Sequence, residues 1–356
     1  MSISSLSFNA STRATIMRLQ NELKDATTEQ GTGRFADVGA TLGRLSGEAV
    51  QYHSQESTIK RMQDSNKLVT NRLEVMDDVL TNLRDTAGSL SSSLTTLTSA
   101  INNQVAVKAV QDTARSGLES MIGGLNINAT GQFLFAGAQT DLTPMKDGSR
   151  KVVDAFNSFL SALSTKYSTT VTAATVKAED LEKYFSVDGW SASPGSTKFK
   201  FDDDFDAIWS PHWSTGSTTP IVSRISKNET IESSLSTNDA AFRKLAAAYS
   251  LINSVGIETM GDQARATVAK AAVTRLSAGT DGVTALQAQV GTRLNRVQLA
   301  DESLGSQMVL VQASIERLEG VDTLEAIQRI TSLETQLQAS YTVTGRLKGL
   351  SLMDYI

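Results

Sequence analysis

Cysteine and histidine, which most often bind transition metals or take part in nucleophilic catalysis, are scarce in this chain of 356 residues. The absence of cysteine excludes disulfides, thiolate metal sites and cysteine nucleophiles. The two histidines, His53 and His212, are too few for histidine-based metal sites or most catalytic triads. A cluster of four aspartates could hold Ca²⁺, which prefers several carboxylates, but it lacks EF-hand spacing and also suits a solvated loop: Asp202, Asp203, Asp204 and Asp206. The sequence predicts no enzyme, no cofactor and no metal site.

Two other stretches have the composition of a ligand site. Residues 31–47 are rich in glycine, but their spacing fits neither common phosphate-binding loop, and no strand pattern precedes them. We interpret them as a loop that enters a helix, on which Gly39, Gly43 and Gly47 would form a smooth face for close helix contact. His212 lies between two tryptophans that could stack on a ligand, although packing of a small domain explains the same residues.

Charge and hydropathy exclude two classes of partner. The net charge of −5 and the pI near 5.3 argue against general nucleic-acid binding. The sequence has no stretch of about 18 apolar residues, so no membrane span is predicted. The first twenty residues also lack the basic and apolar regions of a cleaved secretory signal.

The distribution of proline and tryptophan shows where the architecture changes. Residues 1–143 and 221–356 contain no proline, and the three tryptophans fall within the same middle stretch as the prolines. The prolines are Pro144, Pro194, Pro211 and Pro220. Because proline ends or kinks helices, long helical segments are expected on either side of a differently built insert.

The clearest helical pattern lies in residues 45–101, where apolar side chains recur at steps of three or four over about eight heptads. Two polar residues of this seam, Glu56 and Asn66, are of the kind that sets helix register. Residues 290–318 carry a similar stripe, and we expect them to pack along residues 45–101 of the same chain. A break at residues 320–322 precedes the final stripe.

Residues 1–30 carry a weaker helical stripe, and a further stripe follows the break at residues 320–322. We expect residues 1–35 and about 320–356 to be loosely ordered in the monomer and to pair on assembly. The predicted assembly residues are Ile3, Leu6, Ile16, Leu19 and Leu23 near the start, and Leu324, Ile327, Ile330, Leu333, Leu337, Tyr341, Leu347, Leu350 and Leu352 near the end.

The expected fold is mainly α: a long antiparallel helical rod or coiled-coil bundle built from the N- and C-terminal segments, with a small β-rich or α+β inserted domain. The predicted parts are an N-terminal assembly arm (1–44), the rod (45–145 and 236–319), the insert (146–235) and a C-terminal assembly arm (320–356). Short strands are expected at residues 133–135 and at residues 198–205, which alternate as KFKFDDDF.

Four motifs suggest a family. Residues 32–43 contain Thr-Gly-Arg, Asp-Val-Gly and Leu-Gly, and residues 125–137 read LNINATGQFLFAG. Val290-Gly291 is followed by Arg293-Leu294, and residues 337–341 read LQASY ahead of Leu-Ser-Leu at residues 350–352. These motifs resemble the bacterial flagellin family, and within it the proteins that join hook to filament, over roughly residues 1–145 and 285–356.

The resemblance implies a structural component of the bacterial flagellum that connects hook to filament. Its partners would be copies of itself, neighbouring hook-associated and flagellin subunits and an export chaperone at the C-terminal helix. It would leave the cell by the flagellar type III system without a cleaved signal. From the charge and hydropathy, we expect it neither to bind nucleic acid nor to insert into a membrane. Two alternatives remain: flagellin itself, which shares the architecture, and a non-flagellar binding module whose tryptophan-rich insert holds a ligand.

Overall fold

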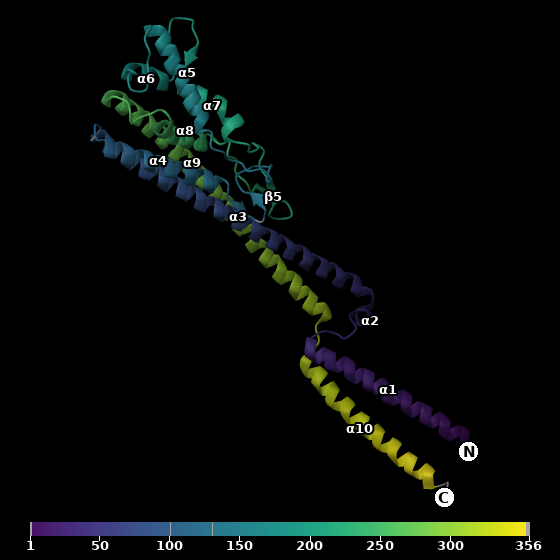
Figure 1. Cartoon of the computed structure of the whole chain (residues 1–356). Helices are drawn as coiled ribbons and strands as arrows, with labels where there is room; N and C mark the ends of the chain where they lie inside the picture. The colour runs from purple at the N-terminus through teal and green to yellow at the C-terminus, as the bar shows by residue number, and fades with distance from the viewer. Residues whose placement is uncertain (1, 100, 130, 354–356) are drawn as a thin grey trace. The chain divides into compact units, whose positions relative to one another are not determined.

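Long helices form the two ends of the chain. The computed structural model describes residues 2–99, 101–129 and 131–353; the side chains of residues 2–9, 99 and 347–353 lie outside this description. The N-terminal helices are α1 (Ser2–Thr32), α2 (Val38–Leu42), the short 3-10 helix η1 (Gly43–Leu45), α3 (Ser46–Ser99) and α4 (Gln104–Leu125). The C-terminal helices are α8 (Ala240–Ser254), α9 (Asp262–Glu319) and α10 (Thr323–Met353) (Figure 1). The mainly α prediction is therefore confirmed.

The chain folds into two compact units, one of Met1–Gln63 with Glu302–Ile356 and the other of Asp64–Asp301. The helices α3 and α9 contribute to both. In the second unit the predicted seam is buried, with no exposed surface on Leu73, Leu80 or Leu90. These residues share one core with Val290 and Val297 of α9. Hence α3 and α9 pack together, as the apolar stripes predicted.

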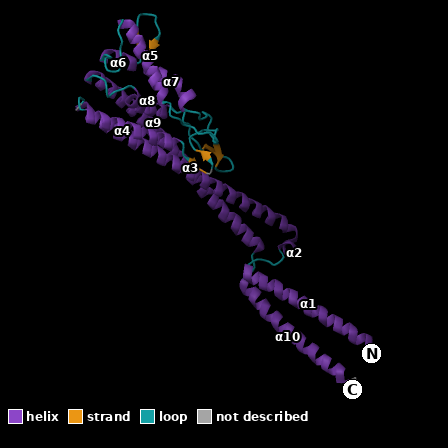
Figure 2. Ribbon diagram, viewed as in Figure 1, coloured by secondary structure: helices purple, strands orange, loops and turns teal. Residues whose placement is uncertain are grey.

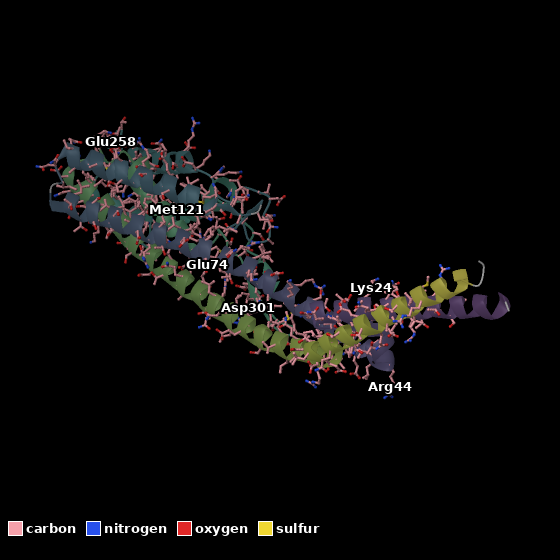
Figure 3. All side chains as sticks on the ribbon, turned by 90° about the horizontal axis from the view of Figure 1, so that it is seen from below. Lys24, Arg44, Glu74, Met121, Glu258 and Asp301 are labelled. Carbon is pink, nitrogen blue, oxygen red and sulfur yellow. The ribbon has the colours of Figure 1, made fainter. Side chains whose placement is uncertain are left out.

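Helix α4 folds back along α3 and packs against α8, and its buried Met121 lies inside this unit (Figure 3). Asp239 caps α8 by accepting a 2.8 Å hydrogen bond from the amide of Ala241. The seam residue Asn66 also contacts the insert. Its amide donates to the carbonyl of Ile225 at 3.0 Å, so it holds a loop of the insert against α3.

Replacing Gly117 by alanine is expected to lower the free energy of unfolding by about 1–3 kcal/mol. A Cβ atom at this position of α4 would lie 2.5 Å from Cε1 of the fully buried Tyr249. The matched control is Gly123→Ala on the same helix, where nothing lies within 4 Å and stability should rise by up to about 1 kcal/mol. Urea denaturation of both variants would measure this, and equal losses would contradict the close contact.

The insert mixes short helices and strands (Figure 2). Its helices are α5 (Ser149–Tyr167), α6 (Ala178–Phe185), α7 (Phe201–Ile208) and the π-helix η2 (Trp209–Trp213). Three antiparallel strand pairs complete the described fold: β1 (Asn128–Ala129) with β2 (Gln132–Phe133), β3 (Trp190–Ser191) with β4 (Lys198–Phe199), and β5 (Val222–Arg224) with β6 (Thr230–Glu232). Aromatic rings fill its core, where Phe159 stacks on Tyr184 at 4.2 Å and meets Trp190 edge-on at 5.5 Å.

The expected strand over residues 198–205 is wrong beyond Phe199, because α7 begins at Phe201. Phe201 and Phe205 are buried while Asp203 between them is exposed, which fits a helix, whereas a strand would place all three residues on one face. Asp202, Asp203 and Asp204 then lie in the first turn, where the helix dipole favours negative charge. The strand predicted at residues 133–135 is likewise shorter, and it ends at Phe133.

The acidic side chains of α7 each have a protein partner. Asp202 pairs with Arg275 at 2.9 Å and Lys244 at 3.6 Å, and Asp203 pairs with Lys200 at 2.9 Å. Asp206 pairs with Arg243 at 3.3 Å. Asp204 accepts a hydrogen bond from the Tyr184 hydroxyl at 3.3 Å, and burial raises the pKa of this carboxyl. Asp202 and Asp206 therefore hold the insert to α8 and α9, whereas Asp203 and Asp204 have their partners within the insert.

Candidate assembly surface and its joint

Helices α1 and α10, together called the arm pair, lie side by side along their length (Figure 1). The Ser- and Thr-rich sequence of α1 remains helical, and hydroxyls of Thr15, Thr27 and Thr28 donate to carbonyls four residues earlier. Charged side chains such as Lys24 occupy exposed positions of α1 (Figure 3). The arm pair thus consists of two antiparallel helices from opposite ends of the chain, within the first unit.

Six of the predicted assembly residues meet inside the arm pair. Leu19, Leu333 and Leu337 keep only 3, 5 and 7% of their surface exposed, and Ile16, Leu23 and Ile330 pack around them. The amide of Gln20 donates to the hydroxyl of Tyr341 at 2.9 Å. These residues hold the two arms of one chain together, so the sequence stripe identified an intramolecular seam.

A second group of predicted residues faces solvent. Leu324, Ile327 and Tyr341 are 69, 44 and 50% exposed. Met17 and Val343, which the stripes did not include, are 57 and 50% exposed. The side chains of Ile3, Leu6, Leu347, Leu350 and Leu352 lie outside the described residues. The arm pair therefore presents large apolar side chains that its own packing does not use.

The ends of α3 and α9 in this unit form a further small core. Ile59, Leu304, Val311 and Ile315 are buried, with Tyr52, Met62 and Met308 packed around them. This core continues the heptad pattern to the point where α9 ends at Glu319.

Residues 33–37 and 319–322, here called the joint, connect the arm pair to α2 and α9. An antiparallel bridge pairs Arg34 with Gly320: the amide of Phe35 donates to the carbonyl of Glu319 at 3.0 Å, and the amide of Val321 donates to the carbonyl of Gly33 at 2.9 Å. Gly33 has φ of +68°, which favours glycine. Asp322 then caps α10 by accepting from the amide of Leu324 at 2.8 Å.

Within the glycine run 31–47, the predicted loop is limited to residues 33–37, between the end of α1 and the start of α2. Asp37 caps α2 by accepting from the amide of Ala40 at 2.8 Å. The interpretation of Gly39, Gly43 and Gly47 as a close-contact face is wrong, because a Cβ atom at Gly43 or Gly47 would meet nothing within 4 Å. Gly43 instead has φ of +52°, in the left-handed region.

Two carboxylates are buried at the joint, and the sequence patterns did not identify either. Glu319, 3% exposed, accepts from the His53 ring at 2.8 Å and pairs with Arg34 at 3.4 Å. Glu29, 7% exposed, pairs with Arg329 at 3.0 Å and accepts from the amide of Ala36 at 3.4 Å. Side chains from α1, α3, α9 and α10 are therefore tied together at one place.

Neither unit offers a metal site or a membrane span among its described residues. No group of three or more His, Asp or Glu side chains there is placed to hold a metal ion. None of the described helices combines the length and apolar character needed to cross a bilayer.

Comparisons with known proteins agree with this architecture. The model of the bacterial flagellin N-terminal helical region matches residues 3–140, and that of the C-terminal helical region matches residues 273–356. Together these regions make up more than half of the chain, and they contain α3, α4 and α10, nearly all of α1 and most of α9. A search of curated protein sequences returned no match.

Two solved structures have a similar fold. One, described as a flagellar hook-associated protein from Vibrio parahaemolyticus, is 12% identical with a TM-score of 0.53, over 77% of this chain and 97% of that one. The other, FlgL of Bacillus cereus, is 9% identical with a TM-score of 0.50, over 75% of this chain and 99% of that one. With both terminal helical regions matched and the paired-helix architecture in place, the chain belongs to the bacterial flagellin family.

Proposed function

We propose that the chain is a hook-associated junction protein, a structural component that connects hook to filament and has no enzymatic role. Family membership supports a flagellar structural role. The finer assignment rests on the FLFAG stretch (residues 133–137) and the LQASY motif (residues 337–341), and on the two structural neighbours described as a hook-associated protein and FlgL.

The observation that carries the proposal is the unused apolar surface of the arm pair. Leu324, Ile327 and Tyr341 remain about half or more exposed although the seam beside them is filled. Exposed groups of large apolar side chains are typical of protein interfaces. Copies of the chain, together with adjoining hook-associated and flagellin subunits, would cover them outside the cell. Before export by the flagellar type III system, without a cleaved signal, a chaperone would cover the same helix.

Deletion of residues 337–356 is expected to abolish filament growth when the shortened chain replaces the full one in cells. The deletion removes Leu337 and Tyr341 and exposes the apolar face of α1. Motility and electron microscopy of the flagella would measure the effect. Because all three tryptophans lie at residues 190–213, tryptophan fluorescence of the purified variant should show an unchanged insert.

Tagging the full chain within the exposed loop near Val187 distinguishes the junction protein from flagellin. A junction protein should label one short zone between hook and filament, whereas label along the whole filament would identify the filament subunit instead.

For the deletion of residues 337–356, filament growth with the shortened chain would contradict an assembly role for the arms.

A further inference from the structure

The joint combines buried carboxylates with exposed cations. The side chains of Glu29 and Glu319 are 9 and 4% exposed, but those of their partners Arg329 and Arg34 are 45 and 51% exposed. A carboxylate that has left water is stable only while a partner compensates its charge. A guanidinium that remains half in water does not depend on its partner in this way. In each ion pair, the buried carboxylate therefore depends on its partner much more than the half-exposed guanidinium does.

The two ion pairs are linked through the backbone bridge. Glu319 accepts from Phe35 through its carbonyl and contacts Arg34 and His53 through its carboxylate. The adjacent amide of Ala36 donates to the carboxylate of Glu29. Consequently, residues 34–36 contact both carboxylates, and movement of this segment would disturb both.

We propose that the joint is a conformational switch: it stays closed while Arg34 and Arg329 compensate the buried charges of Glu319 and Glu29, and it opens as one unit when either guanidinium is withdrawn. Opening breaks the Phe35–Glu319 and Val321–Gly33 hydrogen bonds together and frees the arm pair from the ends of α3 and α9. His53 supports the closed state with a hydrogen bond to Glu319, and its other ring nitrogen lies 3.4 Å from Glu56. The switch is a property of the isolated chain and does not depend on the proposed function.

The proposal predicts an unusual order of effects. Arg329→Gln leaves Glu29 charged, buried and without its cation, whereas Glu29→Gln leaves only a half-exposed arginine. The arginine variant should therefore open the joint more than the glutamate variant. In the double variant Glu29→Gln/Arg329→Gln the buried charge is gone, so the joint should close again in part.

Hydrogen exchange of the purified full-length chain at constant pH, followed by mass spectrometry, provides the measurement. Arg329→Gln should raise exchange roughly tenfold or more in peptides covering residues 33–37 and 319–323, equivalent to about 1.4 kcal/mol of opening free energy. The increase in exchange caused by Glu29→Gln should be several times smaller. Exchange in the double variant should be slower than in Arg329→Gln. Arg34→Gln and Glu319→Gln should repeat this order at the second ion pair.

The matched control is Arg18→Gln, which removes the exposed ion pair between Arg18 and Glu22 on the same helix α1. It should leave exchange at the joint unchanged. The proposal is overturned if Glu29→Gln opens the joint as much as Arg329→Gln, or if only residues 33–37 respond while residues 319–323 do not. Unchanged tryptophan fluorescence of the insert would show that each variant is folded.

Discussion

Replacing Arg265 by methionine is expected to lower the free energy of unfolding by about 3–5 kcal/mol. This side chain is 3% exposed, and it lies where α9 begins. Its guanidinium donates to the carbonyl of Met260 at 2.9 Å, to that of Ile257 at 3.2 Å and to that of Ile101 in the turn between α3 and α4. Methionine fills a similar volume but leaves these carbonyls without donors.

The position of Arg265 explains the size of this effect. An unpaired buried carbonyl loses its hydrogen bond with water and gains nothing in return, which costs about 1–3 kcal/mol for each group. Arg265 also joins the α3–α4 turn to the loop before α9, so its loss would loosen the end of the rod. Lysine cannot replace it, because a single ammonium group cannot reproduce the planar fork of donors.

Urea denaturation followed by circular dichroism would measure the loss. The matched control is Arg296→Met on the same helix, where the arginine is about half exposed and pairs with Glu229 at 2.8 Å. An exposed ion pair of this kind contributes about 0–1 kcal/mol, so this variant should remain nearly as stable as the parent chain. Equal losses in the two variants would show that the carbonyls near Arg265 find other donors.

The rod could be predicted from the sequence because the apolar side chains that form it recur at regular steps of three or four residues. Leu73, Leu80 and Leu90 lie on one face of any helix that contains them, and only a long partner helix can bury that face. The seam of the arm pair could be predicted for the same reason, through residues such as Leu19 and Leu333. The expectation that the arms are loosely ordered before assembly stays a prediction, which the exchange experiment on the joint would also address.

The insert was harder to predict because its strands and two of its helices, α6 and α7, are short. The spacing of Phe199 and Phe201 fits a strand, and the spacing of Phe201 and Phe205 also fits a helix. Four or five residues are too few to decide between the two periods. The outcome depends on tertiary partners, including Arg275, whose guanidinium lies 4.9 Å from the Phe201 ring. No local pattern shows that such a partner is present.

The joint was missed for a related reason. Glu29 and Glu319 look like ordinary solvated residues of polar helix faces, since nothing in their immediate sequence requires burial. Their burial depends on Arg34, His53 and Arg329, which come from separate parts of the chain. Such a cluster of charges leaves no periodic pattern in the sequence. It can be recognised only in the folded structure, where the ends of the helices meet.

Replacing Leu324 and Ile327 together by aspartate is expected to prevent incorporation into the flagellum while the free chain stays folded. Both side chains are exposed, so the double change should alter the free energy of unfolding by less than about 1 kcal/mol. At an interface between subunits, however, each new carboxylate would be buried without a partner. Burial of an uncompensated charge costs several kcal/mol, and each 1.4 kcal/mol weakens association about tenfold.

Two further variants make this experiment specific to the arm surface. Val187→Asp changes a residue of the insert that is 86% exposed, and it should assemble normally. Leu333→Asp places a charge inside the seam of the arm pair, where the side chain is 5% exposed, and it should unfold the arms themselves. Circular dichroism separates these outcomes, because only Leu333→Asp should lose helix in the free chain. Normal filament growth with the Leu324 and Ile327 double variant would mean that the exposed side of α10 is not covered in the assembly, and the interface would then have to lie elsewhere on the chain.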